Sequence, residues 1–263
     1  MVKCFLISVT LLFLAIFLIL PLIVIFIEAF HKGLVAYITS IKDTETLAAI
    51  NLTLITAAIA VPLNMLFGIA AAWFISKFKF KGKSILITLI DVPLSISPVI
   101  VGLSYILVFG IHSWIGEWLS NYGIKIIFAV PGIILSTIFV TFPLVAKQLI
   151  PLMQEQGIEE EEAALVLGAS GWQIFWHITL PNIKWGLLHG ILLSSARAMG
   201  EFGAVSVVSG HIRGLTNTMT LHIEILYNEY HFVTAFAVAS LLTLLALITL
   251  IIKSWVGTQN SKQ

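Results

Sequence analysis

The sequence predicts an all-α integral membrane protein with six transmembrane helices and both termini in the cytoplasm. Three observations support this fold class. Of the 263 residues, 59% are hydrophobic and only 10% are charged, with a mean hydropathy of +1.05, whereas soluble domains carry roughly 25% charged residues. The apolar residues gather in long runs that suit membrane helices. Basic residues gather on one side of these runs, which sets the orientation.

The predicted spans are apolar runs long enough to cross about 30 Å of hydrocarbon as helices. A membrane β-barrel would instead show alternating segments of roughly ten residues, which are absent from this sequence. The first run exceeds the apolar core of a signal peptide, so we expect an uncleaved span. Together the spans form a single transmembrane domain over 1–263, with approximate boundaries at 5–27, 47–75, 85–111, 126–146, 185–208 and 232–252.

Lysine and arginine positions place the N-terminus inside, because cytoplasmic segments of membrane proteins carry the excess of these residues. The strongest indication is the cluster of four lysines between residues 77 and 83. The chain has no basic face that could hold a nucleic acid, so membrane lipid is the expected surroundings. Nine basic residues lie on the predicted cytoplasmic side, namely Lys3, Lys77, Lys79, Lys81, Lys83, Lys147, Lys184, Lys253 and Lys262. The predicted outer side has four, namely Lys32, Lys42, Lys125 and Arg213.

Polar residues and prolines interrupt the third predicted span. Each proline removes a helical hydrogen bond, and free backbone groups at membrane depth are tolerated only against protein or a water-filled cavity. The hydroxyls of Ser95 and Ser97 are therefore candidate ligands along a substrate pathway for an anion. A purely structural kink is the alternative. The interrupting residues are Asp91, Pro93, Ser95, Ser97, Pro98 and Gly102.

The fifth predicted span carries Ser194, Arg197 and Glu201 on one helical stripe. Charges within a span are costly and mark candidate functional sites. Because Arg197 and Glu201 lie four residues apart, we expect them to pair. The pair either locks helix packing or lines the pathway, with Arg197 supplying positive potential for an anion. Gly200 and Gly203 permit a close helix approach or a local break of the backbone.

The polar stretch at 151–182 is predicted to form two short helices on the cytoplasmic side. Glutamates at 159–162 suit the first turn of one helix, and Gly168 is placed to end it. Ser170 is the predicted cap of the second helix, and Pro181 is expected to stop it. That helix presents aromatic side chains, which either pack back on the chain or dock into a partner: Trp172, Phe175 and Trp176.

The spacing within this stretch resembles the EAA loop of importer-type ABC permeases. Seven fixed residues over 20 positions match that pattern: Glu162, Ala163, Ala164, Gly168, Ile178, Leu180 and Pro181. In that family the loop forms coupling helices that sit in a cleft of a cytoplasmic ATPase. The resemblance implies that the seven residues, with Trp172 and Phe175, contact such an ATPase, and that the fold is that of a type I importer.

The resemblance extends over nearly the whole chain. The runs 91–102, 196–214 and 223–230 are similar to oxyanion permeases, and most similar to W-type permease subunits of sulfate/thiosulfate importers. This implies a multi-pass protein of the inner membrane that works with a homologous T-type permease, two ATPase subunits and an extracytoplasmic sulfate-binding protein. The chain has no GxxxxGK[ST] motif. We therefore expect ATP and Mg to be used by the ATPase, with no catalytic residue, metal or cofactor in this chain.

Three alternatives remain open from the sequence. Molybdate and tungstate are tetrahedral dianions like sulfate, so a molybdate/tungstate permease is the second interpretation. A secondary anion transporter or channel would work without ATP and would have no use for a soluble docking loop. A membrane-embedded enzyme would need a convergent acid, base or metal constellation, and the sequence offers none.

Overall fold

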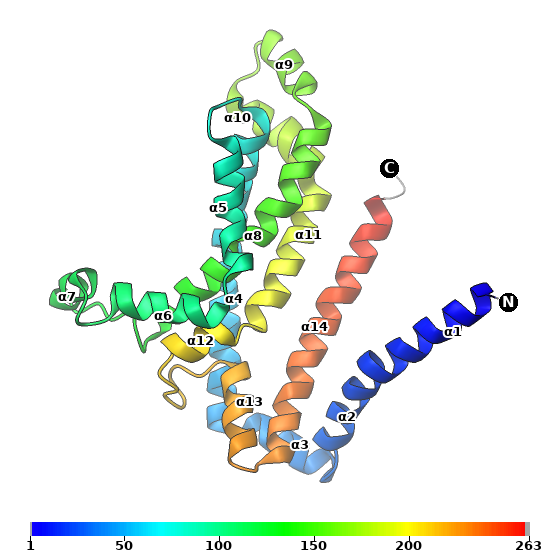
Figure 1. Ribbon diagram of the computed structural model, residues 1–263, viewed down its shortest axis with the longest axis vertical. Coiled ribbons are helices and arrows are strands. Elements are labelled where there is room, and N and C mark those ends of the chain that lie inside the picture. Colours follow the sequence, from blue (N-terminus) through cyan, green and yellow to red (C-terminus); the bar gives the residue numbers. More distant parts are fainter. Residues whose placement is uncertain (1, 261–263) are drawn as a thin grey trace. The chain divides into compact units, whose positions relative to one another are not determined.

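The structure is a computed structural model that describes residues 2–260, and every regular element in that part of the chain is helical. The chain forms two compact units. The first combines the residues up to Thr53 with Ile212–Ala246, and the second combines Leu54–His211 with the residues from Leu247 onward. Two long helices, α4 (Thr44–Lys77) and α14 (Phe232–Asn260), contribute to both units (Figure 1).

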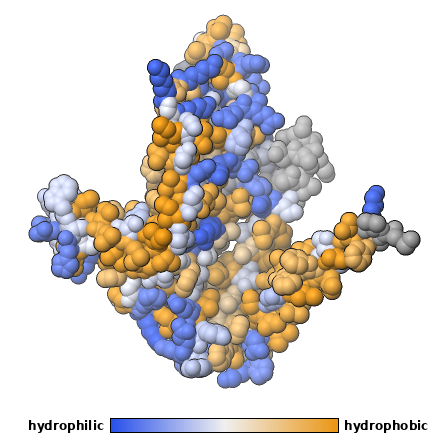
Figure 2. Space-filling model, viewed as in Figure 1, coloured by the Kyte–Doolittle hydropathy of each residue, from blue (hydrophilic) through white to orange (hydrophobic). Residues whose placement is uncertain are grey.

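The first unit begins with a long apolar helix that contains one π-helical turn. Large hydrophobic side chains are exposed along most of its length, and Figure 2 shows it as an almost continuous orange surface. A helix that is apolar on all sides suits lipid rather than water. The elements of this unit besides α4 and α14 are α1 (Val2–Leu14), η1 (Ala15–Ile19), α2 (Leu20–Ala29), α3 (Gly33–Lys42) and α13 (Met219–Asn228).

A polar junction fixes α13 to the start of α4 within the first unit. The Met219 N–H donates to Thr53 Oγ1 at 2.8 Å, and His222 Nε2 lies 3.1 Å from Thr46 Oγ1. Asp43 caps α4, because its carboxylate accepts the N–H of Thr46 at 3.2 Å. His222 is therefore a buried histidine held by a buried hydroxyl.

The second unit is a bundle of α4, α5, α8 and α11, with the remaining helices at its two ends (Figure 1). Its buried core is aliphatic and includes Ile75, Val145, Leu149 and Ile183. Its elements besides α4 and α14 are α5 (Lys83–Ser95), α6 (Pro98–Phe109), α7 (Trp114–Asn121), α8 (Val130–Gln156), α9 (Glu159–Val166), α10 (Gly171–Ile174), the π-helical η2 (Phe175–Thr179), α11 (Leu180–Met199) and α12 (Gly203–Val208).

Glycines bring α4 and α11 close to α8. A Cβ atom built on Gly68 of α4 would lie 2.8 Å from Val145 Cβ, and one built on Gly190 of α11 would lie 3.2 Å from Val145 Cα. Both helices therefore contact Val145 of α8 at distances that a side chain at either glycine would prevent. Small residues at such contacts are the usual means of close helix packing in membranes.

Four helices among the described residues are long and apolar enough to cross a membrane, namely Phe5–Ala29, Thr44–Lys77, Val130–Gln156 and Phe232–Ser254. The pair α5 and α6 adds a fifth if this bent pair counts as one span. The predicted span at 185–208 is divided between α11 and α12. Six crossings and cytoplasmic termini therefore remain predictions.

The buried histidine makes the stability of the first unit depend on pH. Burial lowers the pKa of His222 below its ordinary value of 6.5, while Glu45 and Asp43 oppose the shift and Arg213 adds to it. The folded state thus binds the proton more weakly than the unfolded state does. Stability is full above about pH 6.5 and falls as the pH drops below it, by at most about 1.4 kcal/mol per pH unit.

We expect thermal unfolding of the detergent-solubilised protein to shift to lower temperature between about pH 7.5 and about pH 5. The His222→Gln variant, which keeps a hydrogen-bonding group for Thr46, should show a flatter pH dependence. His31→Gln, which removes an exposed histidine of the same unit, is the matched control. Equal slopes for His222→Gln and the wild type would refute this assignment.

Candidate functional site

The predicted polar loop forms a helical knob, residues 157–179, at one end of α8 and α11 (Figure 1). α8 leads into it and continues to Gln156, beyond residue 146 where the apolar run ends. Helical hydrogen bonding does not stop where hydropathy falls, so α8 carries the knob away from the apolar part of the bundle. The knob begins at Gly157, which has a φ of +69° and turns the chain into α9.

The first helix of the knob is α9, and both predicted ends of this helix are confirmed. Its first turn holds the glutamates at 159–162, where the helix dipole favours negative charge. It ends at Val166, and Gly168 follows with a φ of +88° in the left-handed region. No heavy atom lies within 4 Å of a Cβ atom built on Gly168, so the backbone conformation alone requires glycine there.

The second helix of the knob starts as predicted but does not end as predicted. Ser170 caps α10 through a capping box with Gln173. The expectation that Pro181 stops this helix is wrong, because α10 passes through η2 into α11 with Pro181 in the first turn of α11. The Leu180 N–H donates to the Phe175 carbonyl. This wider π turn accommodates the proline ring.

The sequence left open whether the aromatic side chains of the knob pack back on the chain or stay free for a partner, and the structure shows both. Phe175 is half-buried. The centroid of its ring lies 6.4 Å from that of Trp73 in α4 and 6.1 Å from that of Trp172. Trp172 is 71% exposed, and Trp176 is also exposed. Phe175 therefore joins the knob to α4, while Trp172 and Trp176 remain available to a partner.

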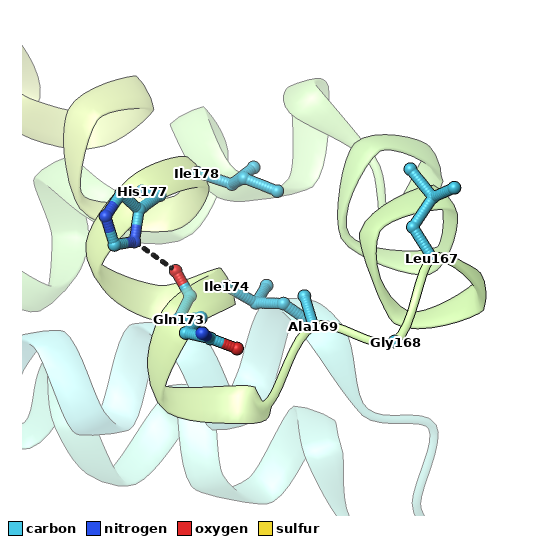
Figure 3. A pocket seen from close by; sticks show the side chains of 7 residues that line it. All are labelled: Leu167, Gly168, Ala169, Gln173, Ile174, His177 and Ile178. Atoms are coloured by element: carbon cyan, nitrogen blue, oxygen red, sulfur yellow. Dashed lines mark hydrogen bonds between the residues drawn. The ribbon is translucent and has the colours of Figure 1, made fainter.

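An open pocket of about 420 Å³ separates α9 from α10 and η2. Figure 3 shows Ile174 and Ile178 on one side and Leu167 on the other, with His177 Nδ1 3.0 Å from the Gln173 carbonyl oxygen. His177 lies in η2. Beside the pocket, Val166 and Leu167 are 87% and 88% exposed. Figure 2 shows an orange patch at this end of the molecule, where Figure 1 labels α9.

The predicted ATPase-docking residues gather in the knob and at its junction with α11. Five are exposed, namely Glu162, Ala163, Gly168, Trp172 and Pro181. The other four are half-buried, namely Ala164, Phe175, Ile178 and Leu180. Beside them lie the exposed apolar side chains of Val166 and Leu167, and exposed apolar surface is typical of a protein-docking site.

The break predicted in the third span lies at Ile96 and Ser97. Both have extended backbones, and α5 and α6 meet at an angle of 103°. Pro93 is accommodated inside α5, whereas Pro98 begins α6. Ser95 Oγ donates to the Asp91 carbonyl at 3.4 Å, and Ser95 and Ser97 are both exposed. Both hydroxyls therefore lie on the surface of the second unit at the bend.

A second break separates α11 from α12 between Gly200 and Phe202. Arg197 Nη2 lies 3.0 Å from Glu201 Oε2, so the predicted pair forms. Glu201 is buried, and its Oε1 accepts the Ala204 N–H at 3.0 Å. Glu201 thus also caps α12, a role that was not predicted from the sequence. The signal for it is an acidic residue three positions before the N–H that it binds. Arg197 keeps part of its side chain exposed.

The two breaks pack against each other. A Cβ atom built on Gly203 would lie 3.0 Å from Pro98 Cβ, and one built on Gly102 would lie 2.8 Å from the Ala204 carbonyl oxygen. α6 and α12 therefore cross in near backbone contact. The helices that follow the two breaks therefore pack against each other, while Ile96 and Ser97 at the first break stay exposed.

Ser194 differs from Arg197 in burial, although both lie in α11. It is fully buried one helical turn beyond Gly190, and Asn64 and Thr141 lie one turn beyond Gly68 and Val145. Asn64 Nδ2 donates to Thr141 Oγ1 at 2.6 Å. Among the described residues, neither Asn64 Oδ1 nor Ser194 Oγ has a hydrogen-bond partner. These side chains form a buried polar layer above the glycine contacts, which sequence reasoning did not find.

Asp91 of α5 forms an ion pair with a lysine of α8. Lys147 Nζ of α8 lies 3.2 Å from Asp91 Oδ1, and both side chains are partly exposed. Asp91 therefore has a partly exposed basic partner. The pair joins α5 to α8, which no local sequence pattern indicates.

Solved structures define the class of this fold. The chain resembles a bacterial alginate ABC transporter in complex with an alginate-bound periplasmic protein, with a TM-score of 0.79, 20% identity and coverage of 97% of this chain and 92% of the other. A second structure of a bacterial ABC transporter that imports alginate gives a TM-score of 0.74 at 20% identity, covering 99% and 95% of the two chains. The fold is that of an ABC transporter permease.

The sequence defines the family. Residues 64–260 match the binding-protein-dependent transport system inner membrane component family, and the chain belongs to it. The sulfate transport system permease proteins CysW of Synechocystis sp. and Escherichia coli K12 are each 50% identical over 96% of this chain, covering 91% and 87% of those proteins. The permease protein CysT of Escherichia coli K12 is 33% identical over 92% of this chain and 87% of its own length.

The crossing of α6 and α12 leaves no room for a side chain at Gly102. Valine at this position would place its Cβ against the Ala204 carbonyl and 2.7 Å from Val207 Cβ. We expect Gly102→Val to destabilise the protein by at least about 1–3 kcal/mol, the usual cost of overpacking. Thermal unfolding in detergent measures this loss. Gly171→Ala is the control, because a Cβ atom there meets nothing within 4 Å, and equal melting of both variants would contradict the packing.

Proposed function

We propose that the chain is the W-type permease subunit of an ATP-driven importer that moves sulfate or thiosulfate across the inner membrane. The observation that carries this proposal is the knob, which presents the seven spaced residues beside an exposed apolar tip on a chain of this family. The 50% identity to sulfate permeases over nearly the whole chain supports sulfate rather than molybdate or tungstate. A permease of this kind is not an enzyme.

The proposed membrane arrangement has six crossings with both termini in the cytoplasm. The bent pair α5 and α6 makes the third crossing, and α11 with α12 makes the fifth. The lysine cluster next to α4 and α5 and the charged knob support a cytoplasmic location for this end of the second unit. The breaks then lie toward the opposite side of the membrane.

The proposed partners follow from the chemistry that the chain lacks. Hydrolysis of ATP with Mg belongs to two separate ATPase subunits, one of which receives the knob. A homologous T-type permease completes the pathway, and a sulfate-binding protein delivers the anion. The resemblance to CysT permeases supports the homologous partner, and the solved alginate transporter with its periplasmic protein supports the binding protein by analogy of fold.

The proposed pathway runs along the exposed side of the two breaks. Ser95 and Ser97 offer hydroxyls at the bend, and the exposed part of Arg197 adds positive charge that Glu201 moderates. Distributed weak donors of this kind let an anion pass without trapping it. Ser194 is part of the same prediction, although its hydroxyl is buried in the layer with Asn64 in this conformation.

Reconstitution of the complete complex in proteoliposomes tests the substrate. We expect the sulfate-loaded binding protein to stimulate ATP hydrolysis and to drive sulfate uptake, and molybdate to do neither. Stimulation by molybdate alone would favour the second interpretation. Uptake without ATP would refute an ATP-driven importer.

Docking of the knob is tested by a pair of glycines with the same backbone geometry. Gly168 and Gly123 have φ values of +88° and +73°, and a Cβ atom at either meets nothing within 4 Å. Alanine therefore strains both turns by a similar amount, about 1–2 kcal/mol. We expect Gly168→Ala to lower both ATPase co-purification and uptake, and Gly123→Ala to leave them near wild type. Equal behaviour of the two variants would contradict docking at Gly168.

A further inference from the structure

A buried lysine holds the joint between the bundle and the knob. Lys77 is the last residue of α4, and its side chain is only 8% exposed. Its Nζ donates to the Gly157 carbonyl at 2.5 Å and lies 3.0 Å from Glu161 Oε1. Gly157 is the left-handed turn through which α8 enters the knob, so Lys77 restrains that turn from outside.

The same carboxylate also holds the exit from the knob. Thr179 Oγ1 donates to Glu161 Oε1 at 2.7 Å, and Thr179 is buried immediately before α11. One oxygen of Glu161 thus receives a bond from α4 and a bond from the η2–α11 boundary. Beside it, Asn182 Nδ2 donates to Glu160 Oε2 at 2.6 Å.

This cluster differs from its neighbours in burial. Lys79 and Lys81 follow Lys77 in the sequence but are exposed, and Glu159 and Glu162 flank the bonded glutamates but are also exposed. The Lys77 and Glu161 side chains are only 8% and 16% exposed, so this ion pair is largely shielded from water. A shielded pair is held more strongly than an exposed one, because breaking it leaves a charge without water or a partner.

The contact matters because α4 has no chain connection to the knob. Peptide bonds join the knob only to α8 and α11. The knob also touches α4 through the apolar contact of Phe175 with Trp73, which has little directional preference. The Lys77–Glu161 pair adds directional bonds: Lys77 binds the Gly157 carbonyl and Glu161, and Glu161 also accepts from Thr179 before α11.

We propose that Lys77 and Glu161 are positioning residues that transmit the movement of the knob to α4 and α11. This inference rests on the proposed function, in which an ATPase moves the knob. The pair does not contact the ATPase or the anion. It makes the knob and the two helices move as one body, so that ATP binding changes the pathway rather than the angle at Gly157.

The test uses the reconstituted complex and compares Lys77→Met with Lys79→Met. Methionine keeps the length of the side chain but removes its charge and its donor. We expect Lys77→Met to retain the ATPase and its hydrolysis, while sulfate uptake per ATP hydrolysed falls by about tenfold or more, because the knob loses its ion pair to α4. Lys77→Arg, which keeps the charge and the donor, should restore coupling, and Lys79→Met should match the wild type.

Glu161→Gln and Glu159→Gln form a second matched pair, and they decide the question if Lys77→Met does not insert into the membrane. Glu161→Gln should uncouple hydrolysis from uptake, and Glu159→Gln should not. Wild-type uptake per ATP in both Lys77→Met and Glu161→Gln would overturn the inference. Failure of the wild-type complex to bind any ATPase would overturn the proposed function as well, so the two failures are distinguishable.

A distance measurement separates transmission from simple stability. Spin labels at Val166 in the knob and at Lys79 beside the end of α4 report the angle between these elements. In the wild type, ATP should leave their separation unchanged, whereas in Glu161→Gln it should change or broaden. An ATP-dependent change of the same size in both proteins would contradict a rigid connection.

Discussion

The close crossing of two interrupted helices is the constraint on which the second unit depends. α5 and α11 each break, and the segments that follow, α6 and α12, meet where Gly102 and Gly203 have no side chains. A break at membrane depth exposes backbone groups that lipid cannot satisfy. The starts of α6 and α12 pack against each other, and Glu201 supplies the N-terminal cap that α12 needs. The same carboxylate also pairs with Arg197. The position of the Arg197 side chain therefore depends on the backbone conformation at the break between α11 and α12.

At the other end of the bundle, the polar knob is attached to helices whose core is aliphatic. Most of the bundle is held by aliphatic packing and close glycine contacts, which resist compression but do not resist sliding. At the knob, directional polar bonds replace them: Lys77 to Glu161, Thr179 to Glu161 and Asn182 to Glu160. Hydrogen bonds and ion pairs fix angles as well as distances, so the connection is stiffest where force is applied under the proposed function.

Features encoded over a few neighbouring residues could be predicted from the sequence. Hydropathy alone located the long helices, since each apolar run is continuous. Gly168 and Ser170 were placed correctly at their helix ends because a left-handed turn and a side-chain cap are local requirements. The Arg197–Glu201 pair follows from helical periodicity, and the break near Ser97 follows from the adjacent proline.

Features that depend on distant contacts could not be predicted in this way. Pro181 should end a helix by local rules, yet a π turn absorbs it while Thr179 is held by Glu161. Lys77 reads as one member of an exposed lysine cluster, and only the fold brings it to Glu161. Asn64, Thr141 and Ser194 come from three separate helices. Their shared layer has no signal along the chain, because it forms only when the three helices pack together.

The apolar tip of the knob has a consequence for how cells make this protein. Val166 and Leu167 stand almost wholly in solvent, and such surface is tolerable only while another molecule shields it. A subunit synthesised in excess would expose this apolar tip to chaperones and proteases, which recognise exposed hydrophobic segments. Under the proposed function, the side chains that suit the tip for docking would also mark an unassembled subunit for removal.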